Sequence, residues 1–237
     1  MIGWAILLLC GWLAAAVSGA AGFGGALLLL PVISHFFGAK AAVPILTLAQ
    51  LLGNVSRAGF GVCDIRWRPA LIFSAGAIPA SIIGARLFVE LPSALVMQVI
   101  GMFLLVVVIL RHTSLGKYPI PRKALAPAGM VVGFLSAVVG SAGPLGAAVF
   151  LSLHLPQLAY VATEAVTATL MHLTKSVIYG RYALITSTDL LVGVALGGAM
   201  ILGSWTGRKL IERLSPQWFS RLVESLLVIA ALSLIFE

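Results

Sequence analysis

Charged residues, cysteines and long polar stretches are all scarce in this sequence. Only 9% of the 237 residues are charged while 61% are hydrophobic, a composition that a water-soluble domain could not present without aggregating. The two cysteines, Cys10 and Cys63, have neither the spacing of a disulfide framework nor that of a metal site. No polar segment is long enough to form a soluble domain. We therefore expect a single membrane domain over residues 1–237.

The hydrophobic residues form long runs without the alternation of porin strands, which predicts helices. The fold class we expect is an all-α polytopic membrane protein. Its formal net charge of +8 comes from basic residues scattered at the ends of the apolar runs. That distribution is typical of membrane topology and not of a nucleic-acid-binding arm. The lipid bilayer is therefore the expected surrounding, and no nucleic-acid partner is expected.

Dividing the chain at charges and turn residues gives eight apolar segments. They lie at about 2–37, 41–62, 69–89, 93–111, 124–156, 159–180, 187–207 and 217–236. The first and fifth segments are too long for one crossing. Either would reach about 50 Å as a single helix, against a hydrocarbon core of about 30 Å. Both segments must therefore bend, break or double back.

A glycine cluster lies where each long segment would break, at 22–25 (Gly-Phe-Gly-Gly) and at 140–144 (Gly-Ser-Ala-Gly-Pro). Sliding the chain on itself by about 118 residues superposes these clusters and places Ser18 on Ser136. We predict that each copy contains a glycine-broken helical hairpin followed by three transmembrane helices. The two tandem repeats are expected at about 1–115 and about 120–237.

The positive charges favour an inverted orientation of the second copy. If both hairpins return to their starting side, most basic loop residues share one face, which should be cytoplasmic. These residues are Arg66, Arg68, Arg111, Lys117, Arg122, Lys123, Arg208, Lys209 and Arg213. Only Lys40, Arg86 and Arg181 remain on the opposite side. We therefore expect inverted repeats, with both termini facing outward.

The motifs AGFGGALLLLP near the N-terminus and GFLSAVVGSAGPLG at mid-chain, with the later GARL and GRKL pair, resemble the TauE/SafE sulfite exporter family. The resemblance covers essentially the whole chain. It implies a duplicated helical bundle that moves sulfite, organosulfonates or related small anions. The second copy matches the glycine motif less well, because Ala142 and Val149 stand where the first copy has Gly24 and Pro31.

A helix interrupted inside the bilayer exposes unpaired amides where its returning half begins, and such ends attract anions. The glycines of both clusters would let a substrate approach that backbone closely. The candidate substrate-binding glycines are Gly22, Gly24, Gly25, Gly140 and Gly143. The alternative is that these glycines only allow close helix packing.

The segment after each hairpin carries polar residues on one helix face. The candidate substrate-binding side chains are Gln50, Asn54 and Arg57 in the first copy, and His172 and Lys175 in the second. At the repeat offset, Asn54 matches His172 and Arg57 matches Lys175. Cations inside a membrane are functional candidates when they face the bundle interior. The alternative is that Arg57 and Lys175 extend to the membrane interface.

Three further residues are weaker candidates for proton coupling. His35 and His154 lie near the ends of the two hairpins, where a histidine could titrate near neutral pH. Glu164 could couple protons or pair with a cation, but its place one turn into a helix favours an interfacial residue.

The sequence therefore predicts a secondary transporter for a small anionic substrate in a bacterial inner membrane. A homo-oligomer is compatible with this prediction. An intramembrane enzyme using Ser141 with His154 or His172 is one alternative, although the surrounding residues are not a nucleophile elbow. A transporter of a different small solute is another. No nucleotide-binding loop and no carboxylate cluster is present in the sequence, so we expect no catalytic residue, cofactor or metal.

Overall fold

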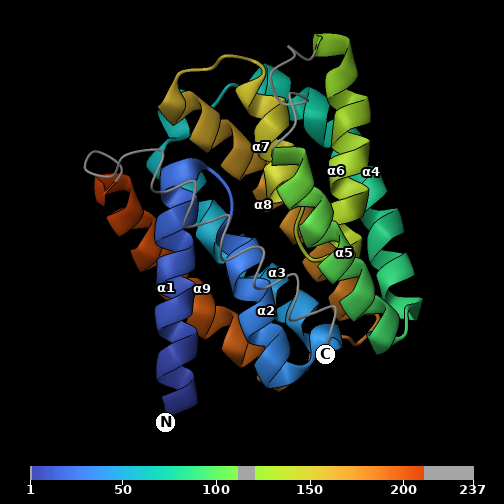
Figure 1. Ribbon diagram of the computed structural model, residues 1–237. Coiled ribbons are helices and arrows are strands. Elements are labelled where there is room, and N and C mark those ends of the chain that lie inside the picture. Colours follow the sequence, from blue (N-terminus) through green and yellow to red (C-terminus); the bar gives the residue numbers. More distant parts are fainter. Residues whose placement is uncertain (1, 112–120, 211–237) are drawn as a thin grey trace.

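The structure is a computed structural model, and it describes residues 2–111 and 121–210 (Figure 1). This part of the chain is built from helices and contains no strand. The expected all-α class is therefore confirmed. The segment expected at 217–236 lies outside the described residues.

The helices follow the predicted apolar segments closely. They are α1 (Ile2–Ala21), α2 (Gly25–Phe37), α3 (Ala39–Phe60), η1 (Val62–Asp64), α4 (Trp67–Glu90), α5 (Ser93–Arg111), η3 (Arg122–Ala124), α6 (Leu125–Val138), α7 (Gly143–Leu151), α8 (Gln157–Arg181) and α9 (Ser187–Leu210). The same order occurs in both halves of the described chain. A broken helix pair comes first, and two long helices follow it.

Both expected helix breaks are confirmed. The first falls between α1 and α2, where Gly22 and Gly24 have φ angles of 77° and 101°. The second falls between α6 and α7, where Gly140 has a φ angle of 83°. A side chain at these angles would be strained, so glycine allows the chain to reverse.

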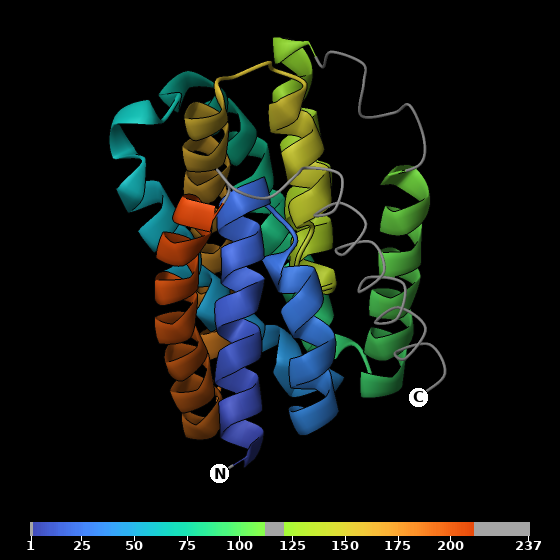
Figure 2. The same ribbon diagram turned by 60° about the vertical axis from the view of Figure 1, so that its left-hand side comes forward.

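The two broken pairs run in opposite directions (Figures 1 and 2). α1 rises from the N-terminus and α2 returns downward, whereas α6 descends from the other end and α7 returns upward. α3 and α8 are also oppositely directed. Each broken pair therefore returns toward the end from which it started.

Helices of the two halves pack against each other in a reciprocal way. α1 lies along α9, α4 lies along α6, and α3 contacts α8 between them. Glycine permits the close approach, because a Cβ atom on Gly129 would lie 2.1 Å from the carbonyl oxygen of Phe73. A Cβ atom on Gly203 would likewise lie 2.2 Å from the carbonyl oxygen of Trp12. Small residues at such contacts are typical of helices that pack in membranes.

The outside of the bundle is apolar. Large hydrophobic side chains such as Ile83, Leu191 and Leu202 are more than 60% exposed. α4 and residues 187–207 of α9 are each long and apolar enough to cross a membrane. In contrast, α3 and α8 bury polar and charged side chains in the interior. Lipid outside and a polar centre inside together suit a membrane-embedded bundle.

Candidate functional site

The tips of the two broken pairs meet inside the bundle. A Cβ atom on Gly143, the first residue of α7, would lie 3.7 Å from the Cβ atom of Phe23 and 4.0 Å from the backbone nitrogen of Gly24. The N-terminal ends of α2 and α7 are therefore close together. The amides at such ends have no partner within their own helix and carry a partial positive charge.

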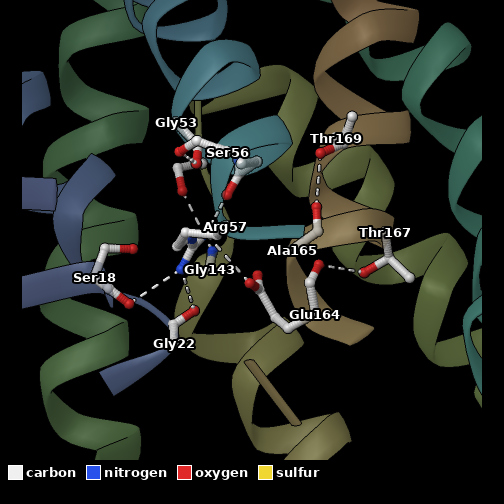
Figure 3. Close-up of polar contacts among 12 residues, drawn as sticks. Ser18, Gly22, Gly53, Ser56, Arg57, Gly143, Glu164, Ala165, Thr167 and Thr169 are labelled. Carbon is white, nitrogen blue, oxygen red and sulfur yellow. Dashed lines mark hydrogen bonds and ion pairs between the residues drawn. The ribbon is translucent and has the colours of Figure 1, made fainter. Parts of the chain in front are cut away.

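Arg57 reaches the first tip from α3 (Figure 3). Its Nη1 atom donates hydrogen bonds to the carbonyl oxygens of Ser18 and Gly22, both at 3.1 Å. These carbonyls belong to the last turn of α1 and the residue just after it; the Ser18 carbonyl also accepts from the Gly22 amide at 2.8 Å, so the guanidinium adds a second bond there and binds the Gly22 carbonyl beyond the helix end. Its positive charge also opposes the negative end of the helix dipole.

Lys175 does the same at the second tip, from α8. Its Nζ atom donates to the carbonyl oxygens of Ser136 and Gly140 at 3.1 Å, and to the Ser136 hydroxyl at 3.0 Å. In both halves the two carbonyls precede the cation by 39 and 35 residues. The match that the sequence predicted between Arg57 and Lys175 thus extends to their bonding partners.

Both cations lie in the interior. Arg57 is 7% exposed and Lys175 is fully buried. The alternative that they extend to the membrane interface is therefore wrong. Their backbone acceptors explain why: each buried cation is held by carbonyl groups at the end of a broken helix, which offset the cost of removing its charge from water.

The two cations differ in what else they contact. The Nη2 atom of Arg57 donates to the side-chain oxygen of Asn54 and forms an ion pair with Glu164 at 3.4 Å (Figure 3). Glu164 is only 5% exposed, so its interpretation as an interfacial residue is wrong. It is the partner of a buried cation, on a helix of the other half.

A small cavity of about 30 Å³ lies between the two tips. Most of the predicted residues line it: Gly22, Gly24, Gln50, Asn54, Arg57, Gly143, Glu164 and His172. Gly25, Gly140 and Lys175 do not. The cavity has room for one or two water molecules, so a larger guest would require the two tips to move apart. The structure thus brings predicted residues of both halves together around one cavity, although Lys175 does not line it.

Two cavity-lining side chains each have one nitrogen with no hydrogen-bond partner among the described residues. The Nε2 atom of Gln50 and the Nδ1 atom of His172 are buried and unpaired, and each residue is 4% exposed. An unpaired buried polar group costs about 1–3 kcal/mol. Each nitrogen therefore has an unused hydrogen-bonding capacity in a residue that lines the cavity.

Sequence reasoning missed several apolar lining residues, namely Phe73, Val132 and Met171. Nothing in the sequence separates them from apolar residues that face lipid. Ser141, considered above only as a nucleophile, also lines the cavity and accepts a hydrogen bond from the Gly143 amide at 3.3 Å.

The two remaining histidine candidates are not at the cavity. His35 lies near the end of α2, and His154 lies in the turn after α7, at the opposite end of the bundle. Both are exposed. Residues 2–111 and 121–210 also contain no group of three or more His, Cys, Asp or Glu side chains that could hold a metal ion.

Comparison with known proteins supplies the family. The family model described as "Sulfite exporter TauE/SafE" matches residues 7–234, nearly the whole chain. Searches of curated proteins and of solved structures gave no match. Proteins of this family are membrane transporters of sulfite and related sulfur anions. The chain therefore belongs to the sulfite exporter TauE/SafE family.

Proposed function

We propose that this protein is a secondary transporter that binds sulfite, an organosulfonate or a related small sulfur oxyanion between the tips of its two broken helix pairs. One observation carries the proposal. Gln50 and His172, from the two halves, line a cavity at the adjoining N-terminal ends of α2 and α7, and each has a buried nitrogen with no hydrogen-bond partner among the described residues. A small oxyanion has acceptor oxygens on several sides, so it can bond to donors from both halves at once.

The charges around the cavity favour an anion. Four helix ends meet there, and the carbonyl ends of α1 and α6 would repel an anion. Arg57 and Lys175 neutralise these ends. The partial positive charges of the helix dipoles at the starts of α2 and α7 are left to act on the guest, while the amides of Gly143 and Leu145 in the first turn of α7 already bond to Ser141 and Ala142. Since Glu164 pairs with Arg57 and no described carboxylate forms an ion pair with Lys175, the net charge of the region is positive.

The proposed architecture is a pair of inverted repeats in one domain. The opposite directions of the two broken pairs and the matched bonding of Arg57 and Lys175 support it. Each repeat would consist of a hairpin and three helices; the last apolar segment of the second repeat, expected at 217–236, lies outside the described residues. Inverted repeats place the substrate site near the membrane midplane and allow alternate access from the two sides.

The position of the basic residues supports a sidedness. Arg66, Arg68 and Arg122 lie at the end of the bundle where α4 and α6 begin, whereas Arg86 and Arg181 lie near the opposite end. By the positive-inside rule, the former end is cytoplasmic and the N-terminus faces outward. The proposed setting is a bacterial inner membrane, and a homo-oligomer is compatible with it.

Counterflow in proteoliposomes tests the proposed function. Vesicles loaded with sulfite or methanesulfonate should accumulate labelled sulfite, and vesicles loaded with chloride should not. Replacing the cavity-lining amide in Gln50→Leu should reduce this uptake by about tenfold, the equivalent of one lost bond to a charged guest. The matched control is Gln157→Leu, because Gln157 is an exposed glutamine at the start of α8.

Two results would contradict the proposal. If uptake of labelled sulfite is the same whether the vesicles contain a sulfur anion or chloride, the proposed substrate class is wrong. Equal uptake by the Gln50→Leu and Gln157→Leu variants would remove the site while leaving transport itself intact.

A further inference from the structure

A second hollow, separate from the central cavity, opens at the end of the bundle where α4 and α6 begin. Its volume is about 250 Å³. Its lining residues are Arg66, Arg68, Pro69, Ile72, Arg122, Leu125, Leu153 and Leu155. None of them lines the cavity between the helix tips. The proposed substrate site therefore does not account for this hollow.

Three arginines surround the hollow because the fold brings two helix starts together. Arg66 immediately precedes α4, Arg68 lies in its first turn, and Arg122 begins η3 just before α6. α4 and α6 pack closely along their length. The backbone amide of Arg66 also donates a hydrogen bond to the hydroxyl of Thr163 on α8, at 2.9 Å. The position of the arginines is thus fixed by the bundle itself.

The guanidinium groups of these arginines have no acceptor among the described residues. They form no ion pair and no side-chain hydrogen bond there, and all three residues are exposed. The amide ends of α4 and η3–α6 add partial positive charge at the same place. Several guanidinium groups around one hollow are suited to a phosphate, which they can bind with paired hydrogen bonds.

The rest of the hollow is apolar. Ile72, Leu125, Leu153 and Leu155 come from α4, α6 and the turn between α7 and α8. A small inorganic anion gains nothing from such a surface, whereas a hydrocarbon chain does. Leu71, next to Ile72, is 59% exposed on the outside of α4. A chain leaving the hollow can therefore continue along the lipid-facing surface.

From this combination we infer that the hollow binds an anionic phospholipid, with its phosphate between Arg66, Arg68 and Arg122 and an acyl chain over the adjoining leucines. Basic pockets near the ends of membrane helices suit such headgroups. The lipid lies at the starts of α4 and α6, which enclose the second tip. Its binding would hold these two helix starts together.

Native mass spectrometry of the purified full chain tests this inference. The probes are phosphatidylglycerol and phosphatidylcholine with identical acyl chains. We expect the wild-type protein to retain phosphatidylglycerol preferentially. Each Arg→Gln substitution at 66, 68 or 122 should weaken that binding by about fivefold, and should weaken phosphatidylcholine binding less, because choline cancels the charge of its phosphate. The matched controls are Arg86→Gln and Arg181→Gln, exposed arginines at the opposite end.

Further binding measurements distinguish a lipid in the hollow from a soluble phosphate or the transported anion. Leu155→Ser should weaken phosphatidylglycerol binding and leave binding of glycerol 3-phosphate unchanged. Unchanged phosphatidylglycerol binding in all three arginine variants would overturn the inference. So would glycerol 3-phosphate binding as tightly as the lipid, which indicates a soluble phosphate. Displacement of the lipid by sulfite would instead identify an entrance for substrate. These results are independent of counterflow activity in the Gln50→Leu variant.

Discussion

Arg57 and Lys175 hold equivalent pairs of carbonyls in the two halves of the molecule, but only Arg57 continues to the cavity. The ammonium group of Lys175 is occupied by the backbone and hydroxyl of Ser136 and by the backbone of Gly140. The guanidinium group of Arg57 has a second nitrogen, which reaches Asn54 and Glu164. A forked cation can close a helix end and serve the site, whereas a point charge closes the helix end alone.

The comparison separates two tasks that the sequence pattern combines. Stabilising the break in a membrane-embedded helix requires a cation in both halves, because carbonyls without partners are costly in a dry interior. In the proposed site only one half brings a cation to the guest, because Arg57 lines the cavity and Lys175 does not. In the other half His172 stands in the place of Asn54, lines the cavity, and has a buried nitrogen with no hydrogen-bond partner among the described residues.

The largest effect should come from removing the second cation. Lys175→Met leaves the carbonyls of Ser136 and Gly140 unpaired, which should lower the unfolding free energy by about 3 kcal/mol. Thermal unfolding in detergent measures this loss, and transport of every substrate should fall with it. Lys175→Arg, which keeps the cation, is the control. Wild-type stability of Lys175→Met would show that the helix end needs no cap.

Alanine substitutions of the glycines at the two helix breaks should lower the unfolding free energy by different amounts. Gly22→Ala should cost about 2 kcal/mol, because it adds backbone strain and a clash with the ring of Tyr160, whose nearest atoms lie 2.6 Å from the new Cβ. Gly140→Ala should cost about 1 kcal/mol, since its closest neighbour is a Val43 methyl group at 3.3 Å. The same unfolding measurement ranks the two variants. The reverse order would contradict the tip geometry described above.

Arg57→Lys makes the first half resemble the second. The ammonium group can still bond the carbonyls of Ser18 and Gly22, but Glu164 loses its ion-pair partner, so Arg57→Lys should be less stable than wild type and more stable than Arg57→Met. It loses the fork that reaches Asn54 and Glu164, and transport should fall by about tenfold. Thermal unfolding and initial rates in proteoliposomes measure the two effects. If Arg57→Lys is no more stable than Arg57→Met, the separation of the two tasks is wrong.

Glu164→Gln tests the charge that Arg57 faces. Removing the carboxylate leaves the cation free to attract the anion, so binding should tighten by about threefold to tenfold while release slows. Titration of the purified protein with sulfite reports the binding, and the counterflow rate reports the release. Weaker binding would indicate that Glu164 holds Arg57 in its binding geometry. Transport by the variant should also depend less on pH if this carboxylate couples protons.

The smallest effect should come from the exposed histidines. His35→Ala and His154→Ala should transport at rates within about twofold of wild type at every pH, since neither side chain lines the cavity and surface changes are usually small. A flattened pH profile in either variant would restore that histidine as a coupling residue.

Sequence reasoning located the helix breaks because a glycine cluster inside an over-long apolar run has few other physical explanations. It found the polar face of α3 and α8 because a cation is conspicuous among leucines. It could not identify Arg57 as the partner of Glu164, because the two residues lie 107 positions apart in the sequence. It also could not find that Lys175 bonds to backbone carbonyls, because no side-chain pattern reports the position of a carbonyl group.

The reciprocal packing of the two halves has a mechanical consequence. α9 lies against α1 and α3, while α4 lies against α6 and α8. The helices of the first half therefore pack with α9 from the second half. The helices of the second half pack with α4 from the first half. The groups of helices that pack together and the halves of the sequence do not coincide in this protein. The chain passes between the two packed groups at the short connections 61–66 and 182–186, so any movement of one group against the other would have to bend the chain there.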